Sequence, residues 1–115
     1  METFAERSVV LVAFPFSDLS HAKLRPAVVL AYAGRDDWIL CQITSRPYGD
    51  AQALAIIEKD FESGSLLRDS YVRPGKLFTG NRSIIESSVG VIKIDSFARI
   101  IESVIAILRA SLNVS

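Results

Sequence analysis

Two hydrophobic periodicities divide the sequence, and this division limits the fold more than any other feature of the chain. Up to residue 94, short runs rich in β-branched and aromatic residues alternate with turn-forming residues, a pattern typical of strands. After Asp95, apolar residues recur at the spacing of one helix face: Phe97, Ile100, Ile101, Val104, Ile105, Leu108 and Leu112. This order predicts a mainly β (α+β) fold, a small twisted sheet or partly open barrel that a C-terminal amphipathic helix covers.

Turn-forming residues divide the strand pattern into segments. Residues 34–37 predict a hairpin between the second and third strands, and Pro74-Gly75 predicts a bend within the fifth. The polar residues 58–67 predict a loop, and Asp95 is expected to cap the N-terminus of the helix. The six expected strands are 9–16, 25–33, 38–45, 53–57, 69–78 and 88–94.

The composition indicates one folded domain over residues 1–115. Half of the residues are hydrophobic, which offsets the chain entropy lost on folding but exceeds what a chain of this length buries easily. We therefore expect an apolar self-interface and a homodimer. Thirteen basic residues balance thirteen acidic ones, so a polyanionic partner must be met by a local patch rather than by net charge.

The rarest residues exclude several classes of protein. Cys41 and His21 are the only cysteine and histidine, which excludes a disulfide scaffold, an ordinary zinc site and catalysis by two histidines. The longest apolar runs, such as Val9–Phe16, fall well short of the ~20 residues of a membrane span. The N-terminus lacks the pattern of a signal peptide. We expect a cytoplasmic protein without membrane association, in which Cys41 is a small core residue.

Arginine dominates the cations, with nine of the thirteen, and its planar guanidinium suits phosphate oxygens. Residues 64–82 carry four cations against Asp69 alone, whereas residues 50–62 carry four acids against Lys59 alone. The neutral total therefore conceals a basic segment and an acidic segment. Surface ion pairing explains each arginine singly, but several lie at expected strand ends, where the mouth of a barrel gathers them.

The acidic segment offers an alternative kind of site. Glu58, Asp60 and Glu62 alternate, and they would hold a divalent ion if they shared one strand face. A solvated loop beside Ser63-Gly64 is the favoured interpretation, so no metal site is predicted.

Four short motifs follow one another in a specific order. They are Phe14–Ser20 (FPFSDLS), Leu24–Leu30 (LRPAVVL), Gln42–Ser45 (QITS) and Tyr71–Thr79 (YVRPGKLFT). In this order and spacing the chain resembles PemK/MazF-type toxins from about residue 8 to the terminal helix. The resemblance implies an SH3-like barrel with a C-terminal helix, in a homodimer. It further implies the toxin of a bacterial type II toxin–antitoxin system, a metal-independent, sequence-selective endoribonuclease that needs no cofactor, cleaves single-stranded RNA and binds a cognate antitoxin.

The resemblance also assigns catalytic residues. The family's catalytic arginine corresponds to Arg25, its hydroxyl pair to Thr44 and Ser45, and a further active-site arginine to Arg73. RNA carries its own nucleophile, the 2′-OH, so such a site must orient that hydroxyl and stabilise a phosphorane-like transition state. Guanidinium and hydroxyl groups suit both tasks.

Proton transfer and base recognition require other residues. A guanidinium is a poor general base, which leaves His21, Asp18 or a water for proton transfer. Splayed bases stack on aromatic side chains, for which Phe16, Tyr48 and Phe78 are candidates. The expected substrate-binding residues are His21, Arg46, Tyr48, Lys76, Phe78 and Arg82.

Two positions depart from the family pattern. Arg7-Ser8 stands where members usually begin the first strand with Gly-Asp, and Gly75 stands where they often carry an acid. Two other functions therefore stay open: a gyrase-binding toxin of the CcdB type, and a degenerate member that binds antitoxin or RNA without cleaving it. The retained Arg25, Thr44 and Arg73 favour the ribonuclease.

Overall fold

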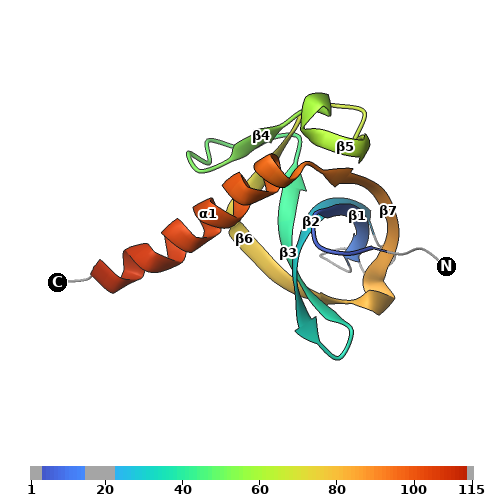
Figure 1. Ribbon diagram of the computed structural model, residues 1–115, viewed down its shortest axis with the longest axis horizontal. Coiled ribbons are helices and arrows are strands. Elements are labelled where there is room, and N and C mark those ends of the chain that lie inside the picture. The colour runs from blue at the N-terminus through green and yellow to red at the C-terminus, as the bar shows by residue number, and fades with distance from the viewer. Residues whose placement is uncertain (1–3, 15–22, 114–115) are drawn as a thin grey trace.

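The computed structural model describes residues 4–14 and 23–113, which form a curled sheet and a long helix (Figure 1). The strands are β1 (Ser8–Phe14), β2 (Lys23–Gly34), β3 (Asp37–Thr44), β4 (Leu54–Ile56), β5 (Phe61–Gly64), β6 (Ser70–Asn81) and β7 (Ile85–Ile92). The helices are α1 (Ile94–Ala110) and the short 3₁₀-helices η1 (Glu58–Asp60), η2 (Arg82–Ile84) and η3 (Ser111–Asn113). The predicted mainly β fold with a C-terminal helix is confirmed.

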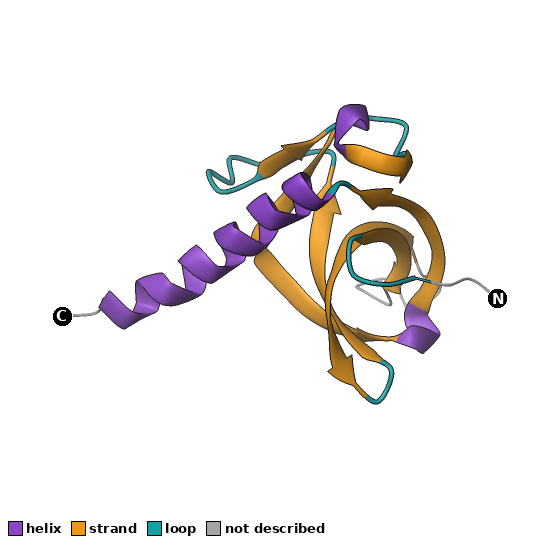
Figure 2. Ribbon diagram, viewed as in Figure 1, coloured by secondary structure: helices purple, strands orange, loops and turns teal. Residues whose placement is uncertain are grey.

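Neighbouring strands of the sheet are antiparallel, in the order β4–β6–β3–β2–β1–β7–β5. Strand twist curls this sheet into a partly open barrel (Figure 2). The predicted hairpin between β2 and β3 is confirmed, and its turn needs positive φ angles of 95°, 54° and 62° at Gly34, Arg35 and Asp36. Because β2 and β3 are antiparallel, the start of β2 and the end of β3 lie at the same edge of the sheet.

The core lies on both faces of the central strands. Val9 and Val10 are neighbours in β1 and fully buried, yet they belong to two different hydrophobic clusters. The cluster of Val9 includes Ile100 and Val104, so α1 covers that face of the sheet. The cluster of Val10 includes Leu40 on the opposite face. Burial on both faces explains why the strands are unbroken apolar runs rather than alternating ones.

The helix α1 begins two residues earlier than expected. Lys93 is its N-cap residue and Asp95 lies in its first turn, so the prediction of an Asp95 cap is wrong. A carboxylate in the first turn is still favourable, because it faces the positive end of the helix dipole. Beyond the sheet the helix projects into solvent (Figure 1), where Leu108 and Leu112 are 60% and 77% exposed. None of the described helices is long and apolar enough to span a membrane.

The acidic segment is folded. The prediction of a loop over 58–67 is wrong for residues 58–64, whereas residues 65–67 form a loop as predicted. The helix η1 and the strand β5 occupy residues 58–64, and Phe61 and Gly64 of β5 pair with Ile92 and Gly90 of β7. Backbone pairing to a neighbouring strand forms β5, although its polar side chains carry no strand pattern.

The Asp60 carboxylate connects η1 to α1. It accepts hydrogen bonds from the Ile57 amide at 2.8 Å, the Ser96 hydroxyl at 2.8 Å and the Arg99 guanidinium at 3.2 Å. In the described part of the chain, no three His, Cys, Asp or Glu side chains are grouped so as to hold a metal ion. Asp60, one of the three acids of the alternative metal site, therefore joins η1 to α1.

The strand β6 changes its pairing at the predicted bend. Cys41 pairs with Leu77 but Ile43 pairs with Val72, so residues 73–76 bulge opposite Gln42. The bend expected at Pro74-Gly75 is confirmed. It brings the side chain of Arg73 beside that of Gln42, at one end of β3.

Candidate functional site

A cavity of about 320 Å³ opens where the start of β2 and the end of β3 meet the segment before β6. The antiparallel register, with Ala27 opposite Gln42, forces the start of β2 and the end of β3 to this common edge. The structure thus brings together Arg25, Thr44 and Ser45 from separate motifs. The polar residues that line the cavity are Arg25, Gln42, Thr44, Ser45, Arg68 and Ser70.

Two guanidinium groups at this cavity lack partners. Arg25 and Arg68 are exposed, and neither side chain makes a hydrogen bond or ion pair with any described residue. No acidic residue lines the cavity within residues 4–14 and 23–113. An uncompensated positive field over hydroxyl and amide groups is suited to bind a phosphate.

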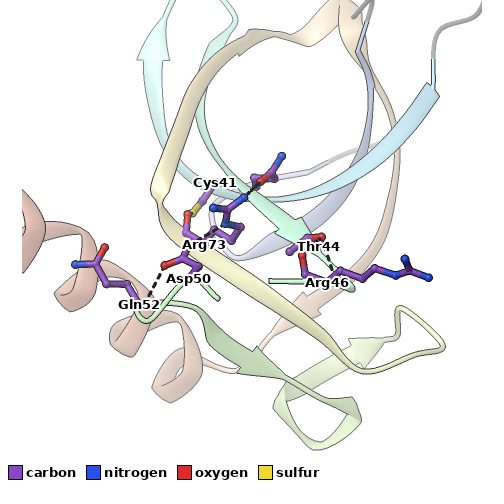
Figure 3. Close-up of polar contacts among 7 residues, drawn as sticks. Cys41, Thr44, Arg46, Asp50, Gln52 and Arg73 are labelled. Atoms are coloured by element: carbon purple, nitrogen blue, oxygen red, sulfur yellow. Dashed lines mark hydrogen bonds and ion pairs between the residues drawn. The ribbon is translucent and has the colours of Figure 1, made fainter. Parts of the chain in front are cut away.

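The two hydroxyls differ in their availability. The Thr44 hydroxyl donates to the Arg46 carbonyl and lies within hydrogen-bond distance of the Arg46 amide, both at 3.1 Å, which fixes the turn after β3 (Figure 3). Ser45 is exposed and has no side-chain hydrogen bond to the described residues. The Ser45 hydroxyl is therefore free for a ligand, whereas that of Thr44 shapes the loop.

Arg73 lies behind the cavity rather than in its lining. Its Nε donates to Asp50 Oδ2 at 2.8 Å, and its Nη1 donates to Gln42 Oε1 at 3.3 Å. The side chains of Arg73 and Asp50 are only 21% and 15% exposed. The hydrogen bond from Arg73, followed by that from the Gln52 amide, holds the pKa of Asp50 below its ordinary value. Arg73 thus reaches the cavity through Gln42.

Several residues of the site escaped the sequence prediction. Gln42 is the first residue of the motif Gln42–Ser45, but no role was predicted for it. Its place in the same motif as the hydroxyls of Thr44 and Ser45 was a signal that it belongs to the site. Arg68 and Asp50 were counted only as members of the basic and acidic segments. The pairing of Asp50 with Arg73 spans 23 residues, a separation that only the folded sheet closes.

Three of the expected substrate-binding residues are exposed near elements of the site. Arg46 and Tyr48 lie on the loop that follows β3, and Lys76 lies on the bulge of β6. Tyr48 is 79% exposed and has a φ of 53°, so the loop presents its ring to solvent.

The structure separates the other expected residues from the cavity. Phe78 packs against the cluster of Val10, and the guanidinium of Arg82 lies 5.1 Å from the centre of the Phe4 ring. Both belong to the far end of β6 and its continuation, away from Thr44. The predictions for Phe16, Asp18 and His21 lie outside the described residues.

Cys41 is a core residue, as expected. It is fully buried, and its thiol donates to the Arg73 carbonyl at 3.0 Å. Burial raises the pKa of the Cys41 thiol to about 12. Such a group is neutral and inert at physiological pH, and its bond supports the backbone of the β6 bulge.

Comparison with protein families gives one match. The model of a family described as the PemK-like, MazF-like toxin of type II toxin–antitoxin systems matches residues 5–108. No curated protein matches the sequence.

Solved structures similar to this chain share its fold at low sequence identity. A MazE–MazF structure from Deinococcus radiodurans has a TM-score of 0.71 at 20% identity, covering 93% of this chain and 97% of that chain. A mycobacterial endoribonuclease in complex with its cognate antitoxin has a TM-score of 0.71 at 12% identity, covering 92% and 95%. The Mycobacterium tuberculosis toxin MazF-mt6 has a TM-score of 0.66 at 15% identity, covering 85% and 92%.

Proposed function

Because the chain belongs to the PemK-like, MazF-like toxins of type II toxin–antitoxin systems, we propose that it is a metal-independent, sequence-selective endoribonuclease of single-stranded RNA. One observation carries the proposal: Arg25 and Arg68, which have no partner among the described residues, share a cavity with the hydroxyls at the end of β3. The similar endoribonuclease from a mycobacterial species supports it at the level of the fold.

The cavity suits a reaction in which RNA supplies the nucleophile. The 2′-OH attacks the adjacent phosphorus, the bond to the 5′-oxygen breaks, and the products are a 2′,3′-cyclic phosphate and a 5′-OH. Charge that develops on the non-bridging oxygens is met by Arg25 and Arg68, and Ser45 orients one oxygen. No carboxylate or imidazole of the described residues lines the cavity. The 2′-OH gives its proton to His21, Asp18 or a water, and a proton is returned to the 5′-oxygen as it leaves.

The loop after β3 supplies the contacts to the RNA chain. Arg46 follows the reacting phosphate along the backbone, and Tyr48 offers its exposed ring to a neighbouring base. Lys76 adds a second backbone contact from β6. Phe78 packs against the core and therefore takes no part in stacking.

The protein has two protein partners, one at the cavity and one at exposed apolar surface. A cognate antitoxin, with an acidic and partly disordered segment, folds over the cavity and covers its arginines. A second copy of the chain covers apolar surface such as Leu108 and Leu112, which forms the homodimer. The antitoxin thus blocks the site by competing with cytoplasmic RNA for Arg25 and Arg68.

The nucleophile can be tested on the substrate. A mixed-sequence RNA is digested in excess EDTA, the cut site is mapped, and the same RNA is synthesised with one 2′-deoxy nucleotide there. We expect the RNA to give a 2′,3′-cyclic phosphate end and the deoxy substrate to stay uncut at that bond. Cleavage of the deoxy bond at the same rate would assign the attack to water and overturn the mechanism.

A further inference from the structure

A chain of side-chain contacts links the β3–β4 loop to the cavity. Asp50 on that loop accepts from Arg73 at 2.8 Å, and Arg73 donates to Gln42 at 3.3 Å. Of these three residues only Gln42 lines the cavity. The first two are mostly buried, so their geometry is set within the protein rather than by solvent.

The contact with Arg73 gives the Gln42 amide a direction. Its Oε1 accepts from Arg73, which leaves the Nε2 amino group as its other end, without a partner among the described residues. A guanidinium donates only, so the amide cannot be reversed without losing this bond. Gln42 lines the same cavity as Arg25 and the hydroxyl residues Thr44 and Ser45.

We propose that the Gln42 amino group donates to a phosphate oxygen of the RNA, and that Asp50 is a positioning residue that orients Gln42 through Arg73. The proposal rests on the proposed function for its substrate. It assigns Arg73 to support rather than to phosphate contact, because its charge is balanced by a carboxylate 2.8 Å away.

Asp50 is itself held rigidly. Its Oδ1 accepts from the Gln52 amide at 2.9 Å, its own amide donates to the Pro47 carbonyl at 3.0 Å, and its carbonyl accepts from Ala53 at 3.1 Å. Without this carboxylate, Arg73 would turn toward a bound phosphate and release the Gln42 amide. The loop therefore fixes the orientation of a donor in the cavity.

Gly75 is a second position at which a carboxylate could replace the negative charge of Asp50. A Cβ there would meet Gln52 Oε1 at 3.9 Å and Ile107 Cδ1 at 4.0 Å, which are ordinary contacts. Gly75 thus faces the loop that carries Asp50, two residues after Arg73 in the bulge of β6. A Cβ at this position is accommodated, so the Gly75→Asp substitution places a carboxylate on the same bulge as Arg73.

The first experiment replaces the amino group of Gln42, a hydrogen-bond donor, with an acceptor. Gln42→Glu keeps the side-chain length and an oxygen for Arg73, but it replaces the amino group with an acceptor. We expect kcat for RNA cleavage in EDTA to fall by about 10²-fold, as for removal of one transition-state donor. Asn113→Asp, the same chemical change on the exposed η3, serves as the control and keeps the wild-type rate. Cleavage by Gln42→Glu at the wild-type rate would overturn the role of Gln42.

The second experiment separates positioning from folding. Asp50→Asn is expected to lower kcat about 10-fold with little change in KM, because it loosens the orientation of the Gln42 amino group without removing a group that contacts the RNA. Adding Gly75→Asp is expected to restore most of the rate, and Asp36→Asn on the β2–β3 turn is the charge-matched control. Urea unfolding of each variant identifies any that lose stability. An Asp50→Asn variant that is folded and fully active would overturn the role of Asp50.

A binding measurement decides the inference even if RNA is not cleaved. Inorganic phosphate is titrated into ¹⁵N-labelled protein while the side-chain amide resonances of Gln42 are followed. We expect these resonances to shift in the wild type and in Asp36→Asn, but weakly in Asp50→Asn. Failure of the wild type to cut RNA would overturn the proposed function alone, whereas unmoved Gln42 resonances in the wild type would overturn this inference.

Discussion

The Asp60 carboxylate holds groups from two elements through one buried side chain. Burial raises the pKa of this carboxyl, but hydrogen bonds from Ile57 and Ser96 and the charge of Arg99 outweigh that effect and keep the pKa below its ordinary value of 3.8. A carboxyl whose pKa is lower in the folded than in the unfolded state stabilises the fold above about pH 4, and this stabilisation is lost on further acidification.

We predict that Asp60→Asn lowers the free energy of unfolding at pH 7 by about 2 kcal/mol, because buried donors lose a charged acceptor. Urea unfolding at a series of pH values measures it. The wild type is expected to lose stability as the pH falls below about 4, and Asp60→Asn to lose less over the same range. Glu102→Gln, an exposed acid beyond the first turn of α1, is the control. Parallel pH curves for the wild type and Asp60→Asn would contradict this assignment.

The placement of site residues was predictable where the sequence puts a residue at a strand end. Arg25 and Ser45 are such cases, because antiparallel pairing brings the start of β2 to the end of β3. Asp50 was not predictable, because its partner Arg73 is distant in sequence and the bulge of β6 aims the guanidinium. Counting charges placed Asp50 in the acidic segment and Arg73 in the basic segment, although the two side chains neutralise each other in the fold.

At the scale of elements, the edge pairing of β5 with β7 depends on close approach of two backbones. Gly64 has a φ of 72°, and a Cβ at this position would overlap the carbonyl oxygen of Val89. Gly90 on β7 is equally restricted, since a Cβ there would lie 2.7 Å from the Ser63 carbonyl oxygen. These glycines let two polar segments pair without side chains between them.

We predict that Gly64→Ala lowers the free energy of unfolding by about 3 kcal/mol, because it adds a steric overlap to an unfavourable φ. The matched control is Gly49→Ala, which has a φ of 77° but nothing within 4 Å of the added Cβ. The control is expected to cost about 1 kcal/mol. Chemical denaturation of both variants measures the difference, and equal costs would show that contact with Val89 is unimportant.

Hydrophobic patterns predicted the central strands and α1 because those elements are defined by buried side chains. The runs at 25–33 and 38–45 became β2 and β3, and the helical spacing after Asp95 became α1. Strand β5 was missed because backbone hydrogen bonds and glycine contacts define it, and these leave no hydrophobic signature.

At the scale of the whole molecule, the curled sheet gathers separate motifs into one basic cavity. The chain is neutral overall, yet no described acid lines the cavity, and Arg25 and Arg68 face it unpaired. Acids elsewhere are committed to structure, as Asp60 is to α1 and Asp50 to Arg73. The fold thus places two arginines that are unpaired among the described residues in the cavity proposed to bind a phosphate.

The most direct measurement compares the rate at which the wild type and Arg25→Ala cleave a long mixed-sequence RNA in excess EDTA. Arg109→Ala, an exposed arginine on α1, is the matched control. We predict discrete cleavage by the wild type and by Arg109→Ala, and a rate about 10²- to 10³-fold lower for Arg25→Ala. Intact RNA with the wild type would contradict the account and favour a toxin that acts by binding. Cleavage that requires added metal would contradict the metal-independent mechanism.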